Sequence, residues 1–217
     1  MHHNHIQEPN EEPCGKTAGH LNVRNFSLPY SLSNPAESCG ECARYPFHQD
    51  PVKYNQIASH IEGVFNIQGH KLQKVKDLAQ KIKEGLQKIS PFIQRSVEAV
   101  CPSCSNVCCI NKHGYYNYED LVYIHALDLK IHDYDFGGKD STPCQFLSEK
   151  GCIMERSVRP SGCNWYFCEP LFDHMESKAE YGKFDNELRD VAELWLELIS
   201  EFARVIKGMD KPYPILL

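Results

Sequence analysis

The sequence predicts a mainly α-helical fold in which helices pack around a small cysteine-lined centre, with one short β-hairpin. Two long segments repeat apolar residues every three or four positions, which is the spacing of amphipathic helices. Two short apolar segments flank a turn that ends in glycine, which is typical of a hairpin. Cysteine makes up 11 of the 217 residues, and eight of the cysteines fall between Cys101 and Cys168.

The chain is predicted to divide into an N-terminal arm, residues 1–66, and a helical cysteine-cluster domain, residues 67–217. The first 50 residues are rich in Pro, Asn, Glu, Ser and His, so we expect most of the arm to be irregular. The spacing of Cys39 and Cys42 suits half of a zinc site. The roles of this pair and of Cys14 are left open.

A helix is predicted to begin at the end of the arm. Asp50 is a typical N-cap residue, and Pro51 suits the first position of a helix because it needs no hydrogen bond from its nitrogen. Apolar residues then follow at helical spacing: Tyr54, Ile57, Ile61 and Val64.

The longest helical pattern begins near Lys71 and carries lysines on its polar face. Ser90-Pro91 predicts a break or kink, because proline removes a backbone donor and crowds the preceding turn. The apolar pattern continues in phase as far as Cys101, so we expect helices near 71–89 and 91–105. The net charge of −6 favours an ordinary solvent-exposed lysine face over one that binds nucleic acid.

Two further helices and a hairpin are predicted downstream. Asn117 and Asp120 form a capping arrangement that opens a helix near 117–128. Apolar residues at helical spacing predict a long helix near 186–207, which Gly208 ends. Between these helices, we expect a hairpin with Cys144 and Cys152 on opposite arms.

The cysteine pattern predicts metal ligation. The N-terminus lacks the apolar core of a signal peptide and no segment is apolar enough to cross a bilayer, so we expect a cytoplasmic protein without membrane contact. Disulfides are rare in that reducing compartment, which makes a disulfide framework the weaker alternative. The predicted metal ligands are Cys101, Cys104, Cys108, Cys109, Cys144, Cys152, Cys163 and Cys168.

The spacing within the first cysteine run suggests how its thiols are arranged. If the run is helical, Cys101, Cys104 and Cys108 lie within about 60° of one another, at about 100° per residue. Cys109 then points about 100° away from Cys108 and is better placed for a second metal or a bridge. Three thiolates need at least one further ligand, from later in the chain, to complete a four-ligand site.

The metal is predicted from the donor atoms. Thiolates are soft ligands that favour zinc or an iron–sulfur cluster over magnesium, calcium or manganese. Eight thiolates exceed one four-ligand site, so either two sites form or some thiols lie outside the ligand shell. We favour an iron–sulfur cluster by a small margin, with Zn²⁺ as the alternative.

Arg159 and Pro160 stand between the predicted hairpin and Cys163. Proline fixes its own φ and disfavours a helical Arg159, so this step should set the direction from which Cys163 approaches. The positive charge of Arg159 would offset a thiolate-rich site, where four thiolates around Zn²⁺ leave a net charge of about −2. The alternative is a surface arginine paired with Glu155 or Glu169.

These motifs, in this order, resemble the YkgJ-like cysteine-cluster family over residues 90–175. The resemblance rests on Cys101-x2-Cys104-x3-Cys108-Cys109, Pro143-Cys144-x-Phe146-Leu147, Gly151-Cys152-x-Met154-Glu155, Arg159-Pro160 and Cys163-x4-Cys168. The family is described as a zinc- or iron-chelating domain and includes flagellin lysine N-methylases, so it implies that the eight cysteines bind metal. This chain departs from the family pattern at Asn164, where an arginine is frequent, and at the inserted Ser157 and Val158.

We therefore expect a cysteine-ligated metal-binding protein, acting as a redox or metal-handling module. The alternative is an enzyme of the flagellin lysine N-methylase type that uses S-adenosylmethionine, as the resemblance implies. No dinucleotide fingerprint, P-loop, nucleophile elbow or HExxH motif occurs, so no catalytic or cofactor-binding residue is assigned. The expected partner is a metal ion or cluster, and a protein partner is left open.

Overall fold

The computed structural model describes residues 50–104, 107, 109, 114–138, 142–149 and 151–208. Its α-helices are α1 (Pro51–Gln68), α2 (Gln73–Val100), α4 (Tyr118–Ala126), α5 (Gly162–Trp165), α6 (Glu169–Glu176) and α7 (Tyr181–Lys207). The short 3₁₀ turns are η4 (Gly69–Lys71), η5 (Cys101–Ser103) and η6 (Arg156–Val158). The strands β1 (Leu147–Ser148) and β2 (Gly151–Cys152) form an antiparallel pair, so the predicted helical fold with one short hairpin is confirmed in outline.

The first helix begins where the sequence predicts. The Asp50 side chain accepts hydrogen bonds from the backbone nitrogens of Val52 and Lys53, at 3.0 and 3.2 Å, and Pro51 occupies the first turn. The buried face of α1 packs on α4, and both helices belong to the main core. The range 1–66, predicted as an arm, therefore includes a packed helix, and residues 1–49 lie outside the described residues.

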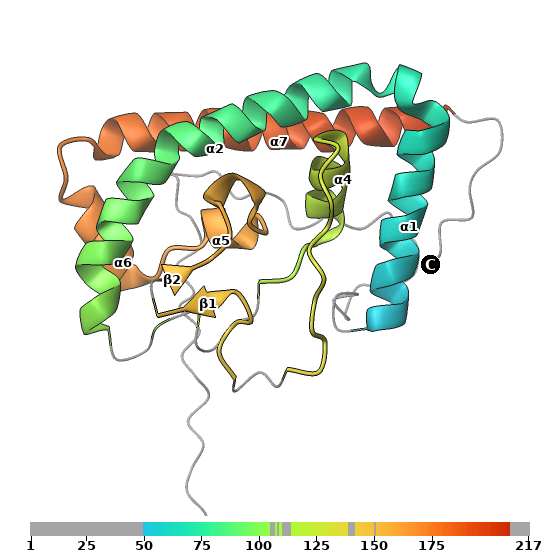
Figure 1. Cartoon of the computed structure of the whole chain (residues 1–217). Helices are drawn as coiled ribbons and strands as arrows, with labels where there is room; N and C mark the ends of the chain where they lie inside the picture. Colours follow the sequence, from blue (N-terminus) through green and yellow to red (C-terminus); the bar gives the residue numbers. More distant parts are fainter. Residues whose placement is uncertain are drawn as a thin grey trace, which may run out of the picture.

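Helix α2 is a single long helix that bends sharply in its C-terminal half (Figure 1). Pro91 lies within this half, and the Ser96 hydroxyl donates to the Phe92 carbonyl at 3.0 Å, so two known causes of helix bending occur together. The predicted kink is present. The prediction of two helices ending near residue 105 is wrong, because the pyrrolidine ring bends the helix without ending it.

The end of α2 also changes how the first cysteine run is arranged. The helix ends at Val100, η5 contains Pro102, and Cys104 has the extended conformation φ −79°, ψ 127°. The helical face predicted for Cys101 and Cys104 is therefore wrong. Cys108 lies outside the described residues.

The two longest helices, α2 and α7, lie side by side and form the main layer of the molecule (Figure 1). Each presents one apolar face to the other, as the spacing of their apolar residues predicts. Their fully buried residues, less than 2% exposed, include Val75, Ala79, Ile82, Leu86, Leu198 and Phe202. The α7 helix begins earlier than predicted and ends before Gly208, as predicted.

The closest approach of these two helices depends on Gly85. A Cβ atom built on Gly85 would clash with Cγ2 of Val191 in α7. Valine has one strongly preferred rotamer in a helix, so this methyl group has little freedom to move away. The absence of a side chain at Gly85 therefore permits the close packing of α2 on α7.

Helix α4 and the hairpin follow their sequence signals, whereas α5 and α6 were not predicted and Cys144 lies before the strand on which it was expected. Asn117 accepts from the backbone nitrogen of Asp120 at 2.7 Å, and Asp120 accepts from that of Asn117 at 3.0 Å, which completes the predicted capping box at α4. In the hairpin, Leu147 pairs with Cys152, and Gly151 has φ +98°, which favours glycine. Cys144 precedes β1 in a turn closed by the 2.8 Å hydrogen bond from Leu147 to its carbonyl.

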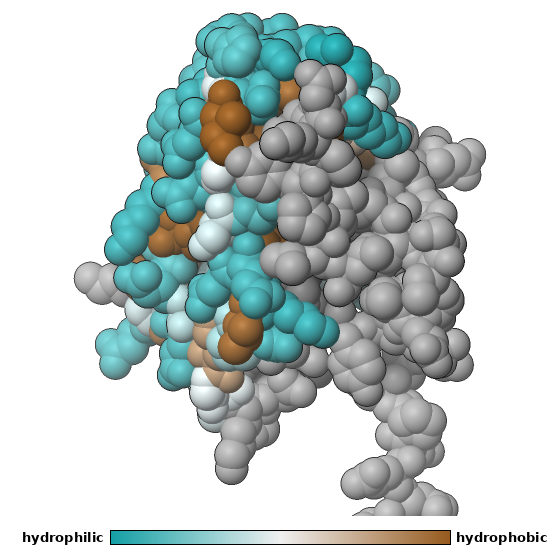
Figure 2. All heavy atoms as spheres, turned by 90° about the vertical axis from the view of Figure 1, so that its right-hand side faces the viewer, coloured by the Kyte–Doolittle hydropathy of each residue, from teal (hydrophilic) through white to brown (hydrophobic). Residues whose placement is uncertain are grey.

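The surface on the α1 side is mainly hydrophilic where its residues are described. Figure 2 shows small, separate hydrophobic patches among teal side chains on this face. None of the described helices is both long enough and apolar enough to cross a bilayer.

Gly85→Ala should lower the free energy of unfolding, despite the better helix propensity of alanine. The propensity gain of about 1 kcal/mol is smaller than the usual overpacking cost of about 1–3 kcal/mol. Urea unfolding followed by circular dichroism measures the change. Gly63→Ala in α1 is the matched control, because its Cβ would meet no atom within 4 Å. The control should be stabilised, and equal stabilisation of both variants would contradict close packing at Gly85.

Candidate metal centre

Seven of the eight predicted ligands belong to the described residues, and all seven are free thiols. They come from the end of α2, the segment after it, the hairpin region, α5 and the residue before α6: Cys101, Cys104, Cys109, Cys144, Cys152, Cys163 and Cys168. Within the described ranges, no group of three or more His, Cys, Asp or Glu side chains is arranged so that it could hold a metal ion. A finished metal centre is therefore not present in this part of the chain.

The thiols nevertheless come near one another in two groups. The first thiol group contains Cys101, Cys104 and Cys168. The backbone N–H of Cys104 donates to the carbonyl of Cys101 at 3.1 Å. Cys168 directly precedes α6, and α6 packs on α2. Burial raises the pKa of the Cys101 thiol, and the neighbouring charges of Cys168, Cys109 and Cys104 raise it further.

The second thiol group contains Cys109, Cys144, Cys152 and Cys163. The backbone nitrogen of Cys144 donates to the carbonyl of Cys109 at 2.8 Å, which joins the first cysteine run to the hairpin region. Burial raises the pKa of Cys109, and the charges of Cys144 and Cys152 add to this effect. The charge of Cys109 also raises the pKa of Cys101, so Cys109 interacts with both groups.

Cys163 is the member of the second group most strongly affected by its surroundings. Its pKa is raised to about 12, first by desolvation and then by the charges of Cys152 and Cys109. The residue still exposes part of its surface, so desolvation here reflects dense protein around the thiol and not complete enclosure. A Cβ on Gly114 would lie 3.2 Å from the sulfur, so the chain passes closely over this cysteine.

Asp120 connects helix α4 to the turn that carries Cys163. One carboxylate oxygen completes the capping box at Asn117, and the other accepts from the backbone nitrogen of Ser161 at 3.0 Å. The carboxylate is 2% exposed, and desolvation raises its pKa to about 7, although the hydrogen bonds from Asn117 and Ser161 oppose the increase. Asp120 thus holds the start of α5, and with it Cys163, against α4.

A buried arginine lies beside the second thiol group. Arg156 is 6% exposed, and its Nη1 atom is 3.4 Å from both the Cys163 carbonyl and the Asn164 side-chain oxygen. Asn164 is fully buried and donates in return to the carbonyl of Arg156 at 3.3 Å. No carboxylate in the described part of the chain lies within ion-pair distance of Arg156.

The charge of Arg156 interacts with the cysteines. Desolvation and, to a smaller extent, the charge of Arg159 lower its pKa to about 10, although the charges of Cys163, Cys152 and Cys109 oppose this decrease. A buried guanidinium is costly unless it is compensated. Among the described residues, the ionised thiolates of these cysteines are the anions that can compensate the charge of Arg156.

Arg159 is half-buried and also lies near the second thiol group. Its Nε atom donates to the Met154 carbonyl at 2.9 Å, and its charge opposes the increase in the pKa of Cys109. The predicted surface pairing with Glu155 or Glu169 is absent among the described ion pairs, and Glu155 instead accepts from Ser157 and Gln87. Arg156 was not among the predicted site residues because no local sequence pattern indicates its burial, whereas the predicted capping box already included Asp120.

Two tyrosines fix the 3₁₀ turn that carries Arg156. The hydroxyl of Tyr116 donates to the Val158 carbonyl at 2.6 Å, and that of Tyr123 donates to the Ser157 carbonyl at 2.9 Å. Both tyrosines are almost completely buried, so these bonds satisfy polar groups inside the core. The segment between the hairpin and α5 is thereby held in one conformation.

No family model, curated protein or solved structure matches this chain. The resemblance to the YkgJ-like family therefore stays a prediction from the cysteine motifs.

Asp120→Asn should change the pH dependence of stability. Because the pKa of Asp120 is higher in the folded state than in the unfolded chain, its protonation stabilises the fold at acidic pH. This contribution is lost as the pH rises through about 7. Urea unfolding of the metal-free protein at several pH values should therefore show that the free energy of unfolding falls more steeply with rising pH in the parent than in the variant. Parallel curves for the two proteins would contradict the raised pKa.

Proposed function

We propose that this chain is a cysteine-ligated metal-binding protein that acts as a redox or metal-handling module. The observation that supports it best is the approach of Cys109, Cys144, Cys152 and Cys163 from separate segments beside a buried arginine. Four thiols match the donor number of a zinc or iron–sulfur site. In the proposal, small movements of these thiols complete the ligand geometry when metal binds, as is usual where metal binding is coupled to folding.

The donor chemistry supports a soft metal. All the proposed ligands are sulfur atoms, which suit an iron–sulfur cluster or Zn²⁺. When bound, a cluster would supply electron transfer, whereas zinc would stabilise the fold. We keep the iron–sulfur cluster as the favoured cofactor.

The surrounding residues support the proposal through charge and position. Arg156 and Arg159 would offset the negative charge of the thiolates, and Asp120 would hold Cys163 through Ser161. Because burial and mutual repulsion raise the pKa values of Cys109 and Cys163, metal binding must displace their protons. Binding should therefore strengthen as the pH rises.

The first thiol group suits a second site. Cys101, Cys104 and Cys168 supply three donors, and a fourth would come from Cys108 or from Cys109. If Cys108 is the fourth donor, all eight predicted cysteines serve as ligands, four in each site. If Cys109 is the fourth donor, the second thiol group keeps only Cys144, Cys152 and Cys163.

The protein purified without oxygen should contain metal, and Cys109→Ser/Cys163→Ser should lose the metal held by the second thiol group. Metal analysis gives the amount, and visible absorption distinguishes a brown cluster from colourless zinc. With two sites the loss should be about half. The matched control is Cys39→Ser/Cys42→Ser, which should leave the metal content unchanged. Metal-free parent protein would overturn the proposal, whereas a loss in the control would show that the arm supplies ligands.

Arg156→Gln should release metal to a chelator about tenfold faster, because groups that support the ligands commonly affect affinity by about 10- to 100-fold. Arg156→Lys keeps the positive charge, so its rate of metal release should lie between those of the parent and Arg156→Gln. Arg159→Gln is the comparison and should have a smaller effect, since Arg156 is the more buried arginine. Stopped-flow measurement with a coloured chelator gives the rates. Equal rates in the parent and Arg156→Gln would show that the guanidinium does not serve the site.

A further inference from the structure

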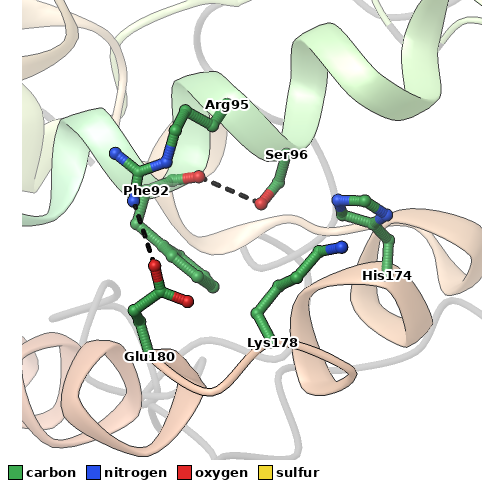
Figure 3. A pocket seen from close by; sticks show the side chains of 6 residues that line it. All are labelled: Phe92, Arg95, Ser96, His174, Lys178 and Glu180. Atoms are coloured by element: carbon green, nitrogen blue, oxygen red, sulfur yellow. Dashed lines mark hydrogen bonds and ion pairs between the residues drawn. The ribbon is translucent and has the colours of Figure 1, made fainter.

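A pocket of about 160 Å³ lies where the C-terminal half of α2 faces α6 and the turn before α7 (Figure 3). None of the described residues that line it is a cysteine, so it is separate from the candidate metal centre. The lining residues are Phe92, Arg95, Ser96, His174, Lys178 and Glu180.

Basic side chains from three segments converge on this pocket. Arg95 comes from α2, His174 from α6 and Lys178 from the turn between α6 and α7. Figure 3 shows the ammonium group of Lys178 and the imidazole of His174 beside each other. The chain as a whole has a net charge of −6, so this concentration of basic groups is local.

The carboxylate of Glu180, the acidic residue of the pocket, offsets the positive charge of these basic groups only in part. Glu180 lies on the opposite side, and its Oε1 atom is 3.9 Å from Nη2 of Arg95. Both side chains are about 60% exposed, so their pairing is weak. In the described part of the chain, neither Lys178 nor His174 has a carboxylate within ion-pair distance.

The floor of the pocket is less polar than its rim. Phe92 is 8% exposed, and its ring lies between Arg95 and Lys178 in Figure 3. The Ser96 hydroxyl already donates to the Phe92 carbonyl, so that bond occupies its proton. An apolar floor strengthens charge interactions above it because it replaces part of the surrounding water.

We infer that this pocket binds a phosphate group, either as inorganic phosphate or as part of a compact phosphomonoester. A phosphate carries up to two negative charges and several acceptor oxygens, which suits one guanidinium and one ammonium acting together. In the bound state the Arg95 side chain turns from Glu180 to the phosphate, and Lys178 binds the phosphate from the other side. Phe92 contacts any organic part of the ligand. This inference does not depend on the proposed metal site.

Titration calorimetry of the full chain with inorganic phosphate and with phenyl phosphate tests the site. Saturable binding is expected, with a dissociation constant of about 1 mM for a small, exposed anion site. Lys178→Gln should weaken binding about tenfold, as the loss of one charge-assisted hydrogen bond implies. Glu180→Gln should strengthen binding, because it removes the carboxylate that competes for Arg95. Tighter binding of phenyl phosphate assigns the site to phosphomonoesters, and equal binding assigns it to inorganic phosphate.

Matched charge changes on α7 provide the controls. Lys183 and Glu187 form an ion pair with a 3.9 Å Nζ–Oε1 distance and do not line the pocket, so Lys183→Gln and Glu187→Gln should both leave phosphate binding unchanged. Absence of saturable binding with either ligand would overturn the inference. An equal loss in Lys178→Gln and Lys183→Gln would also overturn it, because binding would then depend only on net charge.

Discussion

The close packing of α7 on α2 is the constraint on which the rest of the structure depends. Both helices are long, and their apolar faces meet at a short distance because Gly85 has no side chain opposite Val191. The bend of α2 carries its last turns away from α7 and onto α6 (Figure 1). The end of α2 and the start of α6 therefore come together, and with them Cys101 and Cys168.

A second, polar set of contacts holds the segments that no long helix supports. Asp120 binds the turn before α5, while Arg156 and Asn164 bind each other across a buried step of the chain. Buried polar groups of this kind specify one arrangement because any other leaves them without partners. They place Cys163 beside Cys109 and the hairpin, although that region contains little regular structure.

The cysteine run illustrates why spacing alone was insufficient. Cys101, Cys104 and Cys108 occupy positions that share one face of an ideal helix, but the helix ends at Val100. The 3₁₀ turn at Pro102 then leaves Cys104 in extended backbone. Periodicity depends on a continuous hydrogen-bond pattern, and a local change of backbone conformation removes the basis for the predicted face. By contrast, the signals at Asp50, Asn117 and Gly151 depend on contacts within a few residues, and the structure contains all three features.

The sequence by itself determined the helical class, the hairpin, the bend at Pro91 and the cysteines that deserve testing as ligands. These features follow from local backbone preferences, apolar periodicity and composition. Only the tertiary structure decided that Cys109 approaches Cys144, that Arg156 and not Arg159 is the buried charge, and that Arg95 and Lys178 share a pocket. Each of these depends on the packing of distant segments, where burial and contact distance arise only after the helices have met.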